Sequence, residues 1–207
     1  IVFCVVTAVV TVAIGGAMAV LMNALDTWPR VTLQVALLVA WAMPVVAAMT
    51  VWIWIVDWRR GLLNWALVQL GVDQAQGHNW LAEPLSFFVV ASVIIVWTSV
   101  ALSIYAGLTQ VSTEVLEAAA LDGATGIQRL RFIIVPIIAP VLSIVMLLQL
   151  IWDLRVFTQI KLLQDAGGVA NETNLLGTYV SQLGPGRGDL GAARAVSLLI
   201  LGLTVAL

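Results

Sequence analysis

Charged side chains are scarce in this sequence. Asp, Glu, Lys and Arg make up 10% of its 207 residues, against 62% apolar residues. Ordinary soluble domains carry about 25% charged residues. Apolar runs of about 20 residues, the length that crosses a hydrocarbon core of about 30 Å, fill most of the chain. The scarcity of charge therefore excludes a typical soluble domain and indicates a membrane protein.

Cysteine and histidine are also nearly absent. Cys4 is the only cysteine, which excludes an internal disulfide, and His78 is the only histidine. Because His78 has no cysteine or second histidine at metal-ligand spacing, we expect no metal site. The net charge of −2 argues against nucleic acid as a partner. No nucleophile, base and orienting group form a recognisable set, so we expect no enzyme.

Five apolar runs predict membrane-crossing helices. They cover about residues 1–25, 31–56, 85–108, 132–163 and 190–207. The predicted fold class is an all-α, polytopic transmembrane helical bundle with at least five spans. Because the chain begins and ends inside apolar runs, we expect residues 1–207 to be a fragment of a single transmembrane domain.

Small and aromatic residues predict packing sites and interfaces within these runs. Gly15 and Gly16 form a small-residue surface against which another helix could pack closely. Three tryptophans cluster at the end of the second run, as in an interfacial belt: Trp52, Trp54 and Trp58. The loop that follows contains "LLNWALVQL", which could form a short helix along the interface.

Residues 112–131, here called the elbow, form a polar interruption between the third and fourth runs. Ser112 or Thr113 can cap a short helix that continues through "VLEAAAL". Gly123 ends that helix, and Thr125 with Gln128 fits a capping box for a second one. The pattern predicts a helix–turn–helix outside the bilayer.

The first helix of the elbow has two interpretations. Its alanines would let another surface approach closely, beside Glu117 and Asp122, which can form charge-assisted hydrogen bonds. This combination favours a docking surface. A solvated loop with an alanine-rich helix explains the same residues, and the pattern alone does not separate the two.

The stretch "EAAALDGATGIQRLRFIIVP", residues 117–136, resembles the EAA motif of ABC importer permeases. The residues on the motif positions are Glu117, Ala118, Ala119, Gly123 and Pro136. With Asp122 and Ala124, the extended form is similar to the carbohydrate-uptake branch that contains the maltose and glycerol-phosphate permeases. Stretches such as "ETNLLGTYV" and "GDLGAARAVSLLI" extend the resemblance over nearly the whole chain. It departs from the family at Ser112, where a proline is usual, and at "DAGG", which replaces Thr-x-Gly-Gly-Pro.

The resemblance implies a role and partners for the elbow. It would be the coupling helix, seated in a cleft of a cytoplasmic ATPase subunit, with Glu117, Ala118, Ala119, Asp122, Gly123 and Pro136 as its coupling residues. The implied partners are a second permease subunit, two ATPase subunits and an extracytoplasmic substrate-binding protein. ATP and magnesium would bind to the ATPase subunits, and no cofactor to this chain. The resemblance also orients the chain in the cytoplasmic membrane, which the basic residues, found on both faces, do not.

Ionisable residues inside an apolar helix are costly and usually face a bundle interior or a water-filled cavity. Near its end the fourth run contains two ionisable residues, Asp153 and Arg155, together with Gln149 and Trp152, and we take all four as candidates for substrate binding. By the resemblance, Trp152 and Arg155 line the translocation cavity, where an indole face suits a sugar ring and a guanidinium donates to hydroxyls. Thr98 and Ser99 are weaker candidates. Alternatively, Asp153 and Arg155 merely neutralise their surroundings near the outer interface.

The sequence thus predicts one transmembrane subunit of an ABC importer for a carbohydrate or related polyol derivative. A secondary transporter that uses Asp153 and Arg155 for ion coupling is the alternative, and it would not need the elbow. A third possibility is a purely structural subunit, for which substituting Trp152 or Arg155 would leave uptake intact. Neither the sugar nor the identity of the second permease follows from the sequence.

Overall fold

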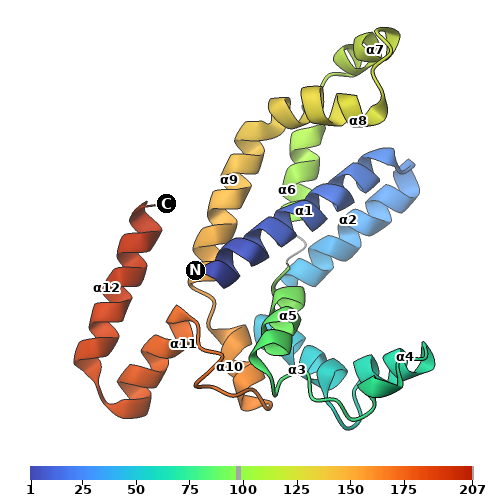
Figure 1. Ribbon diagram of the computed structural model, residues 1–207. Coiled ribbons are helices and arrows are strands. Elements are labelled where there is room, and N and C mark those ends of the chain that lie inside the picture. The colour runs from blue at the N-terminus through green and yellow to red at the C-terminus, as the bar shows by residue number, and fades with distance from the viewer. Residues whose placement is uncertain (97–98, 207) are drawn as a thin grey trace. The chain divides into compact units, whose positions relative to one another are not determined.

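The computed structural model describes residues 1–96 and 99–206, whose regular secondary structure is helical, with no strand among them (Figure 1). The predicted all-α class is confirmed. The chain divides into two compact units. The first unit comprises Ile1–Cys4, Met43–Val96 and Ile151–Leu207, and the second comprises Val5–Ala42 and Trp97–Leu150. A single transmembrane domain over residues 1–207 stays a prediction.

Four apolar helices supply the core of the second unit. They are α1 (Val2–Ala24), α2 (Thr27–Ala42), α6 (Ser99–Leu108) and α9 (Val135–Leu154). The elbow joins α6 to α9 through α7 (Thr113–Leu121), α8 (Gly126–Arg129) and the π-helical turn η2 (Leu130–Ile134). Buried apolar residues from all four helices form one cluster: Ala19, Met22, Leu37, Val100, Ala101, Ile104, Leu108, Ile138 and Val145.

Glycines let two pairs of helices approach closely in the second unit. A Cβ built on Gly15 of α1 would lie 2.7 Å from Val100 Cγ1 of α6, and one built on Gly107 of α6 would lie 3.2 Å from Val141 Cγ1 of α9. The predicted packing surface is therefore confirmed at Gly15. It does not extend to Gly16, where an added Cβ would meet no atom within 4 Å.

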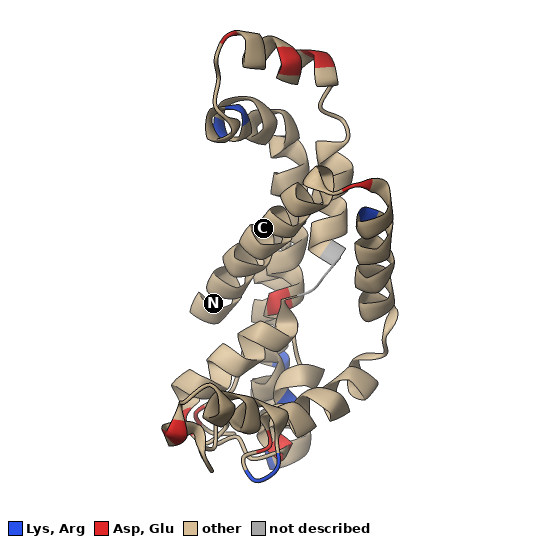
Figure 2. Ribbon diagram, turned by 90° about the vertical axis from the view of Figure 1, so that its right-hand side faces the viewer, with Lys and Arg blue, Asp and Glu red and all other residues tan. Residues whose placement is uncertain are grey.

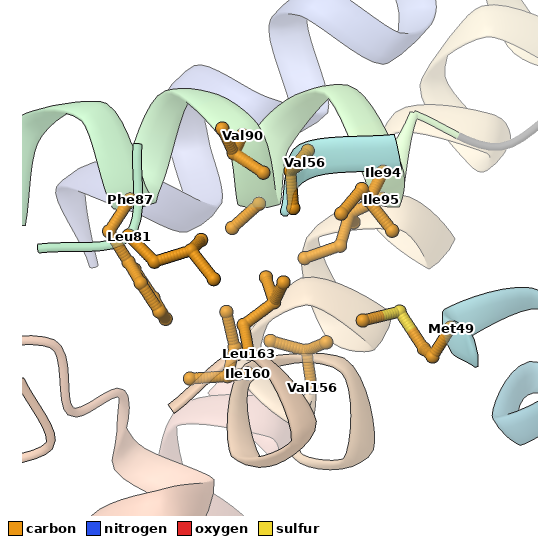
Figure 3. Close-up of a cluster of buried hydrophobic side chains, with 11 residues drawn as sticks. Met49, Val56, Leu81, Phe87, Val90, Ile94, Ile95, Val156, Ile160 and Leu163 are labelled. Carbon is orange, nitrogen blue, oxygen red and sulfur yellow. The ribbon is translucent and has the colours of Figure 1, made fainter. Parts of the chain in front are cut away.

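The first unit consists of shorter helices and connecting loops. Its elements are α3 (Val45–Val56), α4 (Leu62–Gln69), η1 (Asp73–Ala75), α5 (Pro84–Ile95), α10 (Thr158–Asp165), α11 (Leu176–Ser181), η3 (Gln182–Gly186) and α12 (Leu190–Ala206). α10 packs against α3 and α5. Figure 3 shows the buried cluster that these three helices build around Phe87, Ile160 and Leu163. The helix predicted from "LLNWALVQL" is confirmed as α4.

Two expected spans are interrupted or shorter than expected. The run 31–56 breaks at Pro44, which lacks an N–H and disfavours a helical conformation at Met43. α9 ends at Leu154, not near Leu163, because the chain turns at Arg155 and restarts as the separate helix α10. Tertiary packing of α10 against α3 and α5, invisible in the apolar pattern, stabilises this break.

Among residues 1–96 and 99–206, two helical stretches are long and apolar enough to cross a membrane, Val2–Ala24 and Gly126–Leu154. The number rises to four if the pairs α2 with α3 and α5 with α6 each form one broken span. α12 is apolar but has 17 described residues. A count of at least five spans therefore stays a prediction.

Replacing Gly15 with alanine should destabilise the protein, whereas replacing its neighbour Gly16 should not. The new methyl at residue 15 would lie 2.7 Å from Val100 Cγ1 and 3.1 Å from the Ala101 nitrogen, so the two helices must move apart. Such overpacking costs about 1–3 kcal/mol. At residue 16 the methyl has open space and alanine is the better helix former. Thermal unfolding of the purified full-length protein compares the variants, and an equal or higher melting temperature for Gly15→Ala would contradict this packing.

Candidate functional site

The elbow begins with α7, a helix of strong helix formers. Ser112 occupies the N-cap position with an extended backbone, φ −66° and ψ 139°, but its side chain makes no capping hydrogen bond. Ser112 therefore takes the predicted position without the predicted bond. Glu114 lies in the first turn, where a carboxylate interacts favourably with the helix dipole.

Gly123 closes the C-terminal end of α7. The Gly123 N–H donates to the Ala120 carbonyl at 3.1 Å, and the Ala124 N–H donates to the Ala119 carbonyl at 3.0 Å. This pair of bonds is a Schellman motif, which requires a left-handed residue at the position that Gly123 occupies with φ +80°. The spacing between the alanines and the glycine of the EAA motif thus has a local physical cause.

The capping box predicted for the second helix of the elbow is confirmed. The Gln128 N–H donates to Thr125 Oγ1 at 3.4 Å, and the Thr125 N–H donates to Gln128 Oε1 at 2.8 Å. Only Ala124 separates this box from the Schellman glycine. Because both helix ends are satisfied by their own neighbouring residues, the turn has little freedom to change its angle.

The outer surface of the elbow combines charged and apolar residues. Glu117, Ala118 and Asp122 are exposed, whereas Ala119 is buried. In Figure 2 the acidic residues of α7 lie on the outermost helix of this unit, and the basic residues lie on the helical segment that follows it. The elbow also exposes large apolar side chains, above all Leu121 at 89% and Ile127 at 79%, and to a lesser extent Val115.

Sequence reasoning missed Leu121 and Ile127. Both lie in the elbow, which the sequence predicts to be outside the bilayer, where lipid would not cover them. Exposed apolar residues grouped on one feature indicate a protein-binding surface. The sequence shows several apolar residues in the elbow, but which of them are exposed could not be known before folding.

The elbow continues into α9 without a break in the helical backbone. The segment Gly126–Leu154 is one helical stretch of 29 residues. Pro136 is the second residue of α9 and follows the wider turn η2, in which the Val135 N–H donates to the Leu130 carbonyl. Proline lacks an N–H, and π-turns and prolines are the usual causes of bends in helices. The proline of the EAA motif therefore lies where the helix changes geometry.

The four candidate residues near the end of α9 differ in burial. Gln149 and Asp153, one turn apart, are 5% and 2% exposed. Trp152 is 55% exposed, and Arg155 beyond the helix end is also exposed. Trp152 and Arg155 can therefore meet a ligand, whereas Gln149 and Asp153 interact within the protein. The structure does not bring all four to one surface.

The remaining candidates receive no structural support. Thr98 lies outside the described residues, and Ser99 is described only as the first residue of α6. No cluster of His, Cys, Asp or Glu that could hold a metal ion occurs among the residues that the structure describes. Roles for the elbow and for Trp152 and Arg155 stay predictions.

Comparison with known proteins identifies the family. Residues 11–206 match the family of binding-protein-dependent transport system inner membrane components. The chain belongs to this family, which confirms the resemblance of its EAA motif. The family consists of transport-system membrane components rather than enzymes.

Two curated relatives are permeases of sugar uptake systems. The chain is 36% identical to the diacetylchitobiose uptake system permease protein DasB of Streptomyces coelicolor, over 99% of this chain and 64% of DasB. It is 33% identical to the trehalose/maltose transport system permease protein MalF of Thermococcus litoralis, over 82% of this chain and 57% of MalF. The chain thus spans about three fifths of these relatives.

Solved structures support the fold. A chain of a bacterial alginate ABC transporter, in complex with an alginate pentasaccharide-bound periplasmic protein, matches with a TM-score of 0.81 and 21% identity. The match covers 100% of this chain and 73% of the other. At this identity the likeness shows a shared helical permease fold.

Replacing Gly123 with alanine should loosen the elbow, while replacing Gly126 should leave it closed. An L-residue in the left-handed conformation of Gly123 costs about 1–2 kcal/mol. Gly126 begins α8, and a Cβ added there meets no atom within 4 Å. Hydrogen exchange at the Ala124 N–H should therefore accelerate about tenfold in Gly123→Ala only. Equal protection in the two variants would show that the glycine does not hold the turn.

Proposed function

We propose that this chain is a transmembrane permease subunit of an ATP-binding cassette importer that translocates a carbohydrate or related polyol or sugar derivative. The observation that carries the proposal is the elbow. Hydrogen bonds around Gly123 close one side of its turn, and those between Thr125 and Gln128 close the other. The outer surface of the elbow exposes Leu121 and Ile127. A stiff, partly apolar projection is suited to dock into another protein and to move with it.

The elbow would act as a mechanical coupler. ATP bound with magnesium supplies the driving reaction on two partner ATPase subunits, and this chain holds no nucleotide. When those subunits close, they would displace the elbow, and the continuous helical backbone Gly126–Leu154 would carry that displacement into α9. Alternating access follows if this motion switches the permease between inward-open and outward-open states. Glu117 and Asp122 would anchor the elbow by charge-assisted hydrogen bonds.

Family membership and a similar solved transporter support the proposed partners. The family description names a binding protein, and a similar solved transporter was captured with a periplasmic protein. We therefore propose an extracytoplasmic binding protein and a second, homologous permease subunit as partners. The protein would be multi-pass in the cytoplasmic membrane, with the elbow on the cytoplasmic side.

The substrate class rests on the relatives and on the end of α9. Diacetylchitobiose, trehalose or maltose, and sulfoquinovosyl glycerol appear in the names of the relatives, so a carbohydrate is the common chemistry. Trp152 and Arg155 are exposed and offer an aromatic face and five N–H donors, which suit the CH surface and hydroxyls of a sugar. Gln149 and Asp153 would support this segment from the buried side.

Reversing the charge of Glu117 should uncouple the transporter. Glu117→Lys places a cation where the proposal needs an anion at the docking surface, so the ATPase subunits should dissociate or lose substrate-stimulated hydrolysis by about tenfold or more. The control is Glu172→Lys, an equal charge reversal at an exposed loop residue of the first unit. Co-purification and ATPase activity of the reconstituted complex measure both effects. Unchanged uptake that persists without ATP would favour a secondary transporter that uses Asp153 and Arg155 for ion coupling.

Removing the indole of Trp152 should weaken substrate handling without affecting assembly. Loss of an aromatic contact should raise the KM for uptake by about tenfold, while ATPase docking remains normal. Trp41→Ala is the control, because Trp41 is similarly exposed, at 48%, on α2 of the other unit. Uptake that is unchanged in both Trp152→Ala and Arg155→Ala would point to a structural subunit.

A further inference from the structure

A cavity of about 450 Å³ lies in the first unit, where α3 ends and the chain turns into α4. Its lining combines three tryptophans with two arginines: Trp54, Trp58, Trp65, Arg59 and Arg60. The volume is within the range of sites that hold small ligands. Neither the elbow nor the end of α9 contributes to it, so the proposed transport mechanism leaves this cavity without a role.

Asp57 and Gly61 build the turn that carries the two arginines. Asp57 Oδ1 accepts the backbone N–H of Arg59 at 2.9 Å and that of Arg60 at 2.8 Å. The Gly61 N–H donates to the Asp57 carbonyl at 2.8 Å, and a Cβ on Gly61 would lie 2.3 Å from that oxygen. The turn thus uses only the backbone of Arg59 and Arg60, which leaves their guanidinium groups available to a ligand.

Asn64 fixes the neighbouring wall of the cavity. This residue is 7% exposed, and its Nδ2 group donates to the carbonyls of Trp58 at 3.3 Å and His78 at 2.9 Å. Its Oδ1 accepts a hydrogen bond from Trp80 Nε1. Because the buried Asn64 side chain forms all of these hydrogen bonds, it fixes the position of the α4 side of the cavity.

The lining is cationic. It contains two arginines and no carboxylate. The one ion pair among the described residues, Lys161 with Asp165, lies elsewhere, on α10. The Arg59 guanidinium lies 4.6 Å from the centre of the Trp58 ring, which orients it without neutralising it. Planar guanidinium groups are well matched to phosphate oxygens.

Apolar surface continues from the arginines. Trp54, Leu62 and Trp65 line the same cavity and are 55%, 44% and 62% exposed. A ligand that satisfies both parts must carry an anionic group and hydrocarbon chains together. Phospholipids of acidic headgroup have this chemistry, and tryptophans are enriched at the membrane interface where such headgroups lie.

We propose that this cavity binds the headgroup of an anionic phospholipid, with Arg59 and Arg60 on the phosphate and the acyl chains along Trp54, Leu62 and Trp65. A soluble phosphate would satisfy the arginines but leave the apolar surface uncovered. The inference does not depend on the importer function, because a secondary transporter or a structural subunit would bind the same lipid.

Native mass spectrometry of the purified full-length protein, with the subunits that accompany it, tests the proposal. The preparation is titrated with phosphatidylglycerol or with phosphatidylcholine, and bound lipids are counted. In Arg59→Gln/Arg60→Gln the affinity for phosphatidylglycerol should fall about tenfold or more, because each arginine near a membrane surface contributes to the attraction of an anionic headgroup. The Asp57 turn should survive, because it uses backbone N–H groups. Arg59→Lys/Arg60→Lys should restore part of the affinity.

Matched variants distinguish the outcomes. Arg187→Gln/Arg194→Gln removes the same charge from the same unit outside the lining and should leave binding unchanged. Trp65→Ala should weaken phosphatidylglycerol binding, because acyl contact is lost. An unchanged affinity in the Arg59 and Arg60 variants, an equal loss in the control, or displacement of the lipid by an equal concentration of soluble glycerol phosphate would overturn the proposal.

Discussion

Backbone hydrogen bonding is the constraint on which the structure depends. In a hydrocarbon environment an unpaired N–H or C=O group is too costly, so a chain this apolar must satisfy its backbone within helices. Each interruption then needs a local substitute for the lost bonds. Gly123 provides one at the end of α7, Thr125 and Gln128 provide another at the start of α8, and Asp189 Oδ1 accepts the Ala192 N–H at the start of α12. The residues that form these local hydrogen bonds therefore determine where a helix can end and a turn can begin.

The elbow is the interruption with the largest consequence. It closes its own hydrogen bonds at Gly123 and between Thr125 and Gln128, and it exposes Leu121 and Ile127. The helical stretch Gly126–Leu154 begins in the elbow and contains Trp152 near its end. One continuous helical stretch therefore connects the proposed coupling elbow to the proposed substrate contact. The turn at Arg59 and Arg60 uses the same principle, since Asp57 satisfies the backbone and leaves both side chains for another purpose.

Features that depend on near neighbours could be predicted from the sequence. The Thr125–Gln128 box, the helix α4 and the close packing at Gly15 follow from local spacing or residue size. Features set by distant contacts could not. The early end of α9 depends on how α10 packs, and the different exposure of Trp152 and Asp153 depends on which side of α9 is covered. Apolar periodicity is weak where nearly every residue is apolar, so it could not assign those faces.

Site-specific photo-crosslinking tests the central claim, that the elbow contacts an ATP-hydrolysing partner. A photoreactive residue replaces exposed Ala120 on α7 in the full-length protein within its complex, and a second sample carries it at exposed Glu172. The account predicts a crosslink from residue 120 to the ATPase subunit and none from residue 172. A crosslink to that subunit from residue 172, with none from residue 120, would contradict it.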